Sequence, residues 1–81
     1  MKPELIKKEI LNIIKKIKHT SKISIKSNLI KDGFLDSFDI IILVSEIEKI
    51  FKIKVSGDKI NLKNFSNIDQ IYNLVKNASK F

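Results

Sequence analysis

Isoleucine recurs at helical spacing near the start of this chain, and that spacing constrains the fold more than any other feature. Between residues 4 and 18, apolar side chains advance by four, three, one and three positions, which places them along one face of a helix. They are Ile6, Ile10, Ile13, Ile14 and Ile17. Most lysines of the segment fall away from this face, as expected for a helix with one buried side.

Two further helices are predicted. One runs from about Ser37 to Phe51, where Asp36 suits the N-cap position and Asp39 lies three residues later. The other starts at the S-x-x-D signal formed by Ser66 and Asp69. Its apolar residues again keep helical spacing: Ile68, Ile71, Tyr72 and Val75.

The segments between these helices carry weaker signals. Residues 19–35 are expected to form a long loop attached to the core by its apolar side chains, although alternation leaves a short strand at Ile23–Lys26 as the competing interpretation. Those side chains are Ile23, Ile25, Leu29, Ile30, Phe34 and Leu35. Lys52–Val55 is predicted to be an extended loop or a strand, and Leu62–Phe65 is predicted to form one helical turn. Residues 77–81 are expected to fray.

The size of the chain limits what these helices can build. With 81 residues, 43% of them hydrophobic, it supports a single modest core. The absence of cysteine and the single histidine exclude a disulfide framework and a Cys- or His-rich metal site. We therefore expect one all-α domain over residues 1–81, a bundle of three to four helices with a long first loop.

Lysines interrupt every apolar run at the N-terminus, which therefore resembles neither a signal peptide nor a membrane span. A cytoplasmic location, a monomeric state and no stable membrane insertion are expected.

Charge is distributed unevenly along the chain. The net charge is +7 and all 16 basic residues are lysines, yet residues 32–48 contain no lysine. They contain five carboxylates instead: Asp32, Asp36, Asp39, Glu46 and Glu48. A basic nucleic-acid-binding helical module is the alternative function, but the chain lacks arginine and has few aromatics to stack on bases. A membrane-surface role for residues 4–18 lacks interfacial Trp or Phe.

The most informative motif is D-G-F-L-D-S-F-D, residues 32–39. It places Ser37 where a long loop meets the start of a helix, beside two carboxylates. A phosphate ester on this hydroxyl would face the free backbone N–H groups of the first helical turn. The structural alternative is that Asp36 and Ser37 only cap the helix, which is a routine arrangement.

Residues 28–55, N-L-I-K-D-G-F-L-D-S-F-D-I-I-I-L-V-S-E-I-E-K-I-F-K-I-K-V, resemble the acyl carrier protein family. That family has an apolar loop residue, then D-S, then a helix ending in L-E-x-x-F-x-I-x-I. The positions that carry the resemblance are Leu29, Leu35, Asp36, Ser37, Phe38, Leu43, Val44, Ile47, Glu48, Phe51, Ile53 and Val55. The resemblance implies an acyl-carrier-like bundle and a protein that is not an enzyme.

The resemblance also implies a site and partners. A phosphopantetheinyl transferase, using Mg²⁺, would attach 4'-phosphopantetheine from coenzyme A to Ser37, next to Asp36. The thiol of the arm would hold an acyl or aminoacyl cargo as a thioester, loaded by a ligase or acyltransferase and consumed by a downstream synthase or transferase. Partners would contact the helix that begins at the serine. The residues implied in that contact are Asp36, Phe38, Asp39, Ile41, Ser45 and Glu48.

The chain departs from the family pattern in several places. It is net basic, Phe38 stands where leucine is usual, and Ile42 and Lys49 stand where acidic residues are frequent. These departures speak against the standard role in fatty-acid synthesis. The G-x-L-D-S-F pattern is closer to freestanding carriers of specialised pathways, such as D-alanyl carrier proteins, while the cargo itself is not encoded in the carrier.

Overall fold

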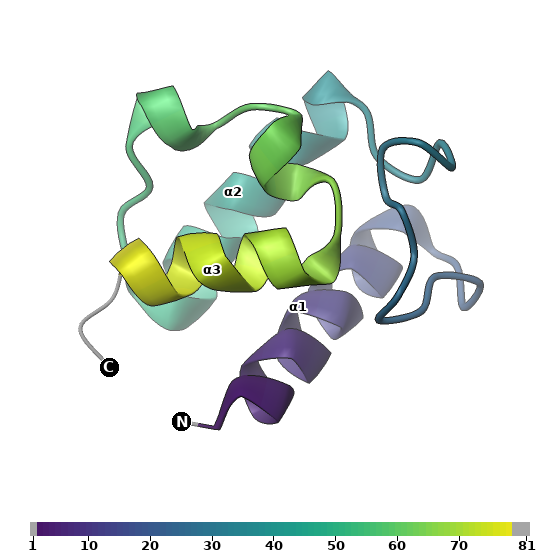
Figure 1. Cartoon of the computed structure of the whole chain (residues 1–81), viewed down its shortest axis with the longest axis horizontal. Coiled ribbons are helices and arrows are strands. Elements are labelled where there is room, and N and C mark those ends of the chain that lie inside the picture. Colours follow the sequence, from purple (N-terminus) through teal and green to yellow (C-terminus); the bar gives the residue numbers. More distant parts are fainter. Residues whose placement is uncertain (1, 79–81) are drawn as a thin grey trace.

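The structure, a computed structural model, describes residues 2–78 (Figure 1). Within them lie the helices α1 (Pro3–Lys18), α2 (Ser37–Phe51) and α3 (Ile68–Ala78). The short 3₁₀ helices η1 (Gly57–Lys59) and η2 (Lys63–Phe65) lie between α2 and α3. No β-strand forms in residues 2–78, so the predicted all-α class is confirmed.

Helix α1 begins at Pro3, whose fixed φ and missing N–H suit the first helical turn. Its buried face carries the isoleucines that the spacing predicted: Ile6, Ile10, Ile13 and Ile14. The helix ends at His19, which adopts a left-handed φ of 52° and donates its N–H to the Lys15 carbonyl. His19 is exposed, as expected for a residue after the last turn.

Helix α2 has the bounds that the sequence predicted, Ser37–Phe51. Four residues of its inner face are buried: Ile40, Leu43, Val44 and Ile47. The helix ends at Lys52, which takes a left-handed φ of 55° and donates its N–H to the Glu48 carbonyl. Because left-handed φ suits glycine best, His19 and Lys52 both carry backbone strain at helix ends.

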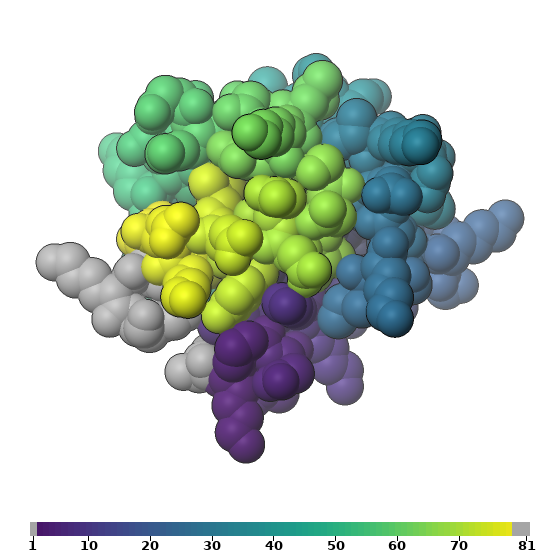
Figure 2. Space-filling view, viewed as in Figure 1, coloured from purple at the N-terminus to yellow at the C-terminus, as the bar shows by residue number. Residues whose placement is uncertain are grey.

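Residues 19–36 connect α1 to α2 through turns, and the competing strand at Ile23–Lys26 does not form. Three apolar side chains of the connection are buried: Ile23, Leu29 and Leu35. Ile25, expected among them, is exposed. The Leu29 N–H donates to the Ser66 carbonyl at 2.8 Å, which ties the connection to the segment before α3. This segment, blue in Figure 2, forms one edge of the face shown.

The chain returns from α2 to α3 through residues 52–67. Lys52–Val55 is a loop rather than a strand, and it buries Val55. The helical turn predicted at Leu62–Phe65 is confirmed as η2, whose Phe65 is fully buried. Together with α3, residues 57–67 form much of the face shown in Figure 2.

The predicted cap of the last helix is wrong by one residue. Ser66 is the C-cap of η2, and its hydroxyl donates to the Lys63 carbonyl at 2.9 Å instead of accepting an N–H from the first turn of α3. Asn67 takes that role, because its Oδ1 accepts the Gln70 N–H at 2.8 Å. Of residues 77–81, expected to fray, the first two belong to α3 and residues 79–81 lie outside the described residues.

Helix α1 packs against both α2 and α3. The buried residues of the described chain are all apolar, so the core contains no buried polar side chain between residues 2 and 78. At its edge, the Lys7 ammonium lies 2.9 Å from Asp69 Oδ1 and 5.2 Å from the centre of the Tyr72 ring. Tyr72 is half-buried and packs at the edge of the core.

Candidate functional site

The site is built on the N-terminus of α2, which is fixed by a reciprocal pair of hydrogen bonds. Asp36 Oδ1 accepts the Asp39 N–H at 2.9 Å, and Asp39 Oδ2 accepts the Asp36 N–H at 3.1 Å. This capping box confirms the predicted N-cap and satisfies two backbone donors that would otherwise have no partner. The two bonds join the residues on either side of Ser37 and Phe38.

Ser37 occupies the first helical position and is exposed. Within residues 2–78 its hydroxyl has no hydrogen-bond partner, and the backbone N–H groups of Ser37 and Phe38 have no acceptor. The hydroxyl therefore does not cap the helix, since that task falls to Asp36. An oxygen that is accessible and unpaired, beside two free N–H donors, suits esterification by a phosphate group.

Asp39 is oriented toward α1 rather than toward solvent. Its Oδ2 lies 2.9 Å from Lys18 Nζ, and its side chain is only 13% exposed. The hydrogen bond from Lys18 is the main cause that lowers the pKa of Asp39 from its ordinary value. Burial is the next largest effect and opposes it, while the hydrogen bonds with Asp36 add to the lowering. The ion pair fixes the last turn of α1 to the first turn of α2.

The outer face of α2 next to Ser37 is apolar. Phe38 is 71% exposed and Ile41 65% exposed. Beside them lies an open groove of about 480 Å³, lined by Ser37, Ile40, Ile41, Ile60, Asn61 and Leu62. The groove therefore joins the serine to a strip of apolar side chains from α2 and from the segment before η2.

The remaining predicted contact residues lie farther along α2. Ser45 is exposed on the same face as Phe38 and Ile41, because positions three, four and seven apart align on a helix. Glu48 is half-buried, and its Oε2 accepts the Val55 N–H at 2.8 Å. Its carboxylate thus satisfies the backbone of the loop after α2 and faces away from the groove.

The structure brings together Asp36, Ser37, Phe38 and Ile41 and separates Glu48 from them. It also adds residues that sequence reasoning missed, namely Lys18, Ile60 and Leu62. No local pattern marked them, since each belongs to an element far from Ser37 along the chain.

Residues 2–78 contain no cluster of His, Cys, Asp or Glu able to hold a metal ion. None of the helices described is long and apolar enough to cross a membrane. Comparisons with protein-family models, curated proteins and solved structures find no match to this chain.

Proposed function

We propose that the chain is a carrier protein, which holds an acyl or aminoacyl cargo as a thioester on a 4'-phosphopantetheine arm attached to Ser37. The observation that carries the proposal is the exposed, unpaired Ser37 hydroxyl at the first position of α2, beside an apolar groove. In this proposal the three helices and their long first connection form an acyl-carrier-like bundle. The resemblance of residues 28–55 to that family supports the same assignment.

The residues around Ser37 fit such an arm. The free N–H groups of Ser37 and Phe38 can donate to the oxygens of a phosphodiester on the serine. The groove that starts at the serine offers the apolar side chains of Ile41 and Leu62 to the chain that follows the phosphate. The arm would supply a terminal thiol, a group that this cysteine-free sequence lacks.

The attachment step needs little from the carrier itself. The Ser37 oxygen would attack the β-phosphorus of the coenzyme A pyrophosphate and displace adenosine 3',5'-bisphosphate, while Mg²⁺ and the base that takes the hydroxyl proton belong to the transferase. The role of the carrier is to position the Ser37 hydroxyl. The capping box between Asp36 and Asp39 holds the serine at the start of the helix, where a partner can reach it.

The outer face of α2 supports a specific kind of partner contact. Its exposed residues are mainly apolar or neutral, with one lysine: Ser37, Phe38, Ile41, Ile42, Ser45, Lys49 and Ile50. The carboxylates of Asp39 and Glu48 are engaged inside the molecule. We infer that the transferase, the loading enzyme and the downstream enzyme would contact α2 chiefly through apolar surface.

The decisive experiment is the intact mass after incubation with coenzyme A, Mg²⁺ and a broad-specificity phosphopantetheinyl transferase. The wild type and the Ser21→Ala variant, which changes an exposed serine outside α2, should each gain one phosphopantetheinyl group. Ser37→Ala should gain none. A folded wild-type protein that gains no mass with several transferases would refute the proposal, and so would modification that persists in Ser37→Ala.

A further inference from the structure

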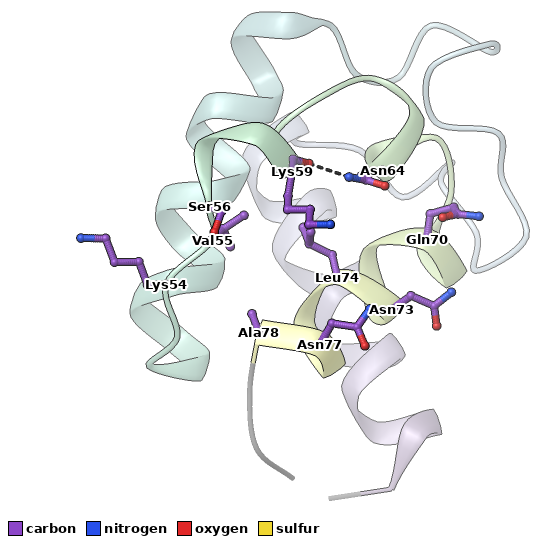
Figure 3. A pocket seen from close by; sticks show the side chains of 10 residues that line it. All are labelled: Lys54, Val55, Ser56, Lys59, Asn64, Gln70, Asn73, Leu74, Asn77 and Ala78. Carbon is purple, nitrogen blue, oxygen red and sulfur yellow. Dashed lines mark hydrogen bonds between the residues drawn. The ribbon is translucent and has the colours of Figure 1, made fainter.

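A second pocket, of about 400 Å³, lies between the segment that follows α2 and helix α3 (Figure 3). Its walls come from residues 54–59, which follow α2, and from the outward face of α3. The pocket and the groove at Ser37 have different lining residues, and they adjoin where Lys59 of the pocket precedes Ile60 of the groove. The volume of the pocket lies within the range of small-molecule sites, roughly 300–1,000 Å³.

One wall of the pocket is a row of amide side chains on α3. Gln70, Asn73 and Asn77 follow one another at steps of three and four, which aligns them on a single helix face. We call these three residues the amide face. Among the described residues, their side-chain amides have no hydrogen-bond partner. Each amide offers two N–H donors and one carbonyl acceptor.

The opposite wall carries a lysine directed toward this face. In Figure 3 the side chain of Lys59 extends from η1 toward Leu74 on α3, whereas Lys54 points away from the pocket. Asn64 Nδ2 donates to the Lys59 carbonyl at 2.7 Å and so fixes the backbone from which Lys59 projects. In the part of the chain that the structure describes, the Lys59 ammonium has no carboxylate partner.

The lining of the pocket also contains no aspartate or glutamate. An ammonium group and several amide N–H donors without a competing carboxylate favour an anion over a cation. Val55 and Leu74, both largely buried, supply a small apolar floor. The pocket therefore combines one positive charge, donors from several directions and a limited apolar contact.

We propose that this pocket binds a small phosphorylated metabolite. The phosphate would lie at the Lys59 ammonium, because lysine acts as a point charge toward a tetrahedral group with several acceptor oxygens. The hydroxyl or ring groups of the ligand would meet the amide face, whose amides both donate and accept. The proposal does not rest on any modification of Ser37, which does not line this pocket.

The test is a ¹⁵N-correlation NMR titration of the full chain at constant ionic strength, in which side-chain NH₂ signals report directly on Gln70, Asn73 and Asn77. The probes are inorganic phosphate, glucose 6-phosphate and AMP, with glucose and adenosine as uncharged counterparts. At least one phosphorylated probe should shift these signals in a saturable manner with a Kd of about 1 mM or lower. The uncharged counterparts should bind at least about tenfold more weakly, a difference of roughly 1.4 kcal/mol.

Two variants separate the site from general electrostatic attraction. Lys59→Ala should weaken the saturable binding at least about tenfold, whereas Lys63→Ala, an exposed lysine outside the pocket, should leave it unchanged. Shifts that never saturate with any of the three phosphorylated probes would overturn the proposal, as would equal weakening by both variants.

A short single-stranded RNA serves as a third arm of the titration. If it binds with a steep salt dependence and shifts the lysine-rich α1, while no phosphorylated probe shifts the amide face saturably, the basic surface binds nucleic acid and the proposed pocket is wrong. Running the titration on Ser37→Ala keeps the result distinct from the carrier proposal. Its outcome does not depend on whether Ser37 is modified.

Discussion

The ion pair between Lys18 and Asp39 allows a quantitative test of how the site is held. It joins residues 21 positions apart and closes the connection between α1 and α2 at the point where Ser37 begins the helix. The perturbation is Asp39→Asn, which keeps an oxygen able to accept the Asp36 N–H but removes the negative charge. A second variant, Asp39→Ala, removes both interactions.

The expected magnitudes follow from the geometry. The backbone hydrogen bond from Asp36 contributes about 1 kcal/mol, as a net intramolecular bond usually does. The ion pair contributes up to about 1 kcal/mol, because the Lys18 side chain is 32% exposed and solvent screens part of the attraction. Asp39→Asn should therefore lower the free energy of unfolding by about 1 kcal/mol and Asp39→Ala by about 2 kcal/mol.

The ion pair also predicts the sign of a pH effect. The pKa of Asp39 is lowered in the folded protein from its ordinary value of 3.8, chiefly by the hydrogen bond from Lys18. A carboxylate with a lowered folded pKa stabilises the protein above its unfolded pKa and loses this contribution as the pH falls through the folded pKa. The destabilisation caused by Asp39→Asn should therefore be full at pH 7 and shrink progressively below about pH 4.

The assay is urea unfolding followed by circular dichroism at pH 7 and pH 3, with Lys18→Met completing a double-mutant cycle. The cycle should give a coupling free energy of about 1 kcal/mol between Lys18 and Asp39 at pH 7. Asp69→Asn is the matched control, because its side chain is 73% exposed and its pair with Lys7 should contribute less than about 0.5 kcal/mol. A coupling indistinguishable from zero at pH 7 would refute the structural role assigned to Asp39.

Three further changes test other parts of the structure. Lys52→Gly should raise the free energy of unfolding by about 0.5 kcal/mol, because glycine relieves the left-handed strain at the end of α2. Lys54→Gly is the control: φ is not positive there, so this change should not raise the free energy of unfolding in the same urea experiment. Glu48→Ala should lower the free energy of unfolding by about 1–2 kcal/mol, because the partly buried Val55 N–H loses its acceptor. Glu48→Gln keeps an acceptor oxygen and should be less destabilising than Glu48→Ala in thermal unfolding. Phe38→Ser should change the free energy of unfolding by less than about 0.5 kcal/mol, because the side chain is exposed, but should lower kcat/KM for the transferase about tenfold. A loss of stability without any kinetic effect would contradict the proposed contact face.

Local sequence patterns predicted the helices of this chain well. The isoleucine spacing located α1, and the Asp36–Asp39 pair located the start of α2, because caps and helical periodicity act within a few residues. The same reasoning placed the cap of α3 on Ser66 instead of Asn67. Both residues are common caps, and only the preceding turn η2, which engages the Ser66 hydroxyl, decides between them.

The directions of side chains around the site could not be predicted from the sequence. Spacing showed that Asp39 and Glu48 belong to α2, but the partner of Asp39, Lys18, comes from α1, which only the tertiary fold brings near, and the partner of Glu48 is a backbone N–H of the irregular loop after α2. The αL conformation of Lys52 was also unmarked, since lysine has no special preference for it. Tertiary contacts of this kind leave no local periodicity.

Three of the five carboxylates between residues 32 and 48 form hydrogen bonds within the molecule. Two of them, Asp36 and Asp39, fix the tip of α2, and Glu48 fixes the loop beyond its end. None of the carboxylates within α2 is fully exposed. If partners recognise α2, we expect the contact to rest mainly on Phe38 and its apolar neighbours, and its strength should depend only weakly on salt because screening acts on charges rather than on apolar area.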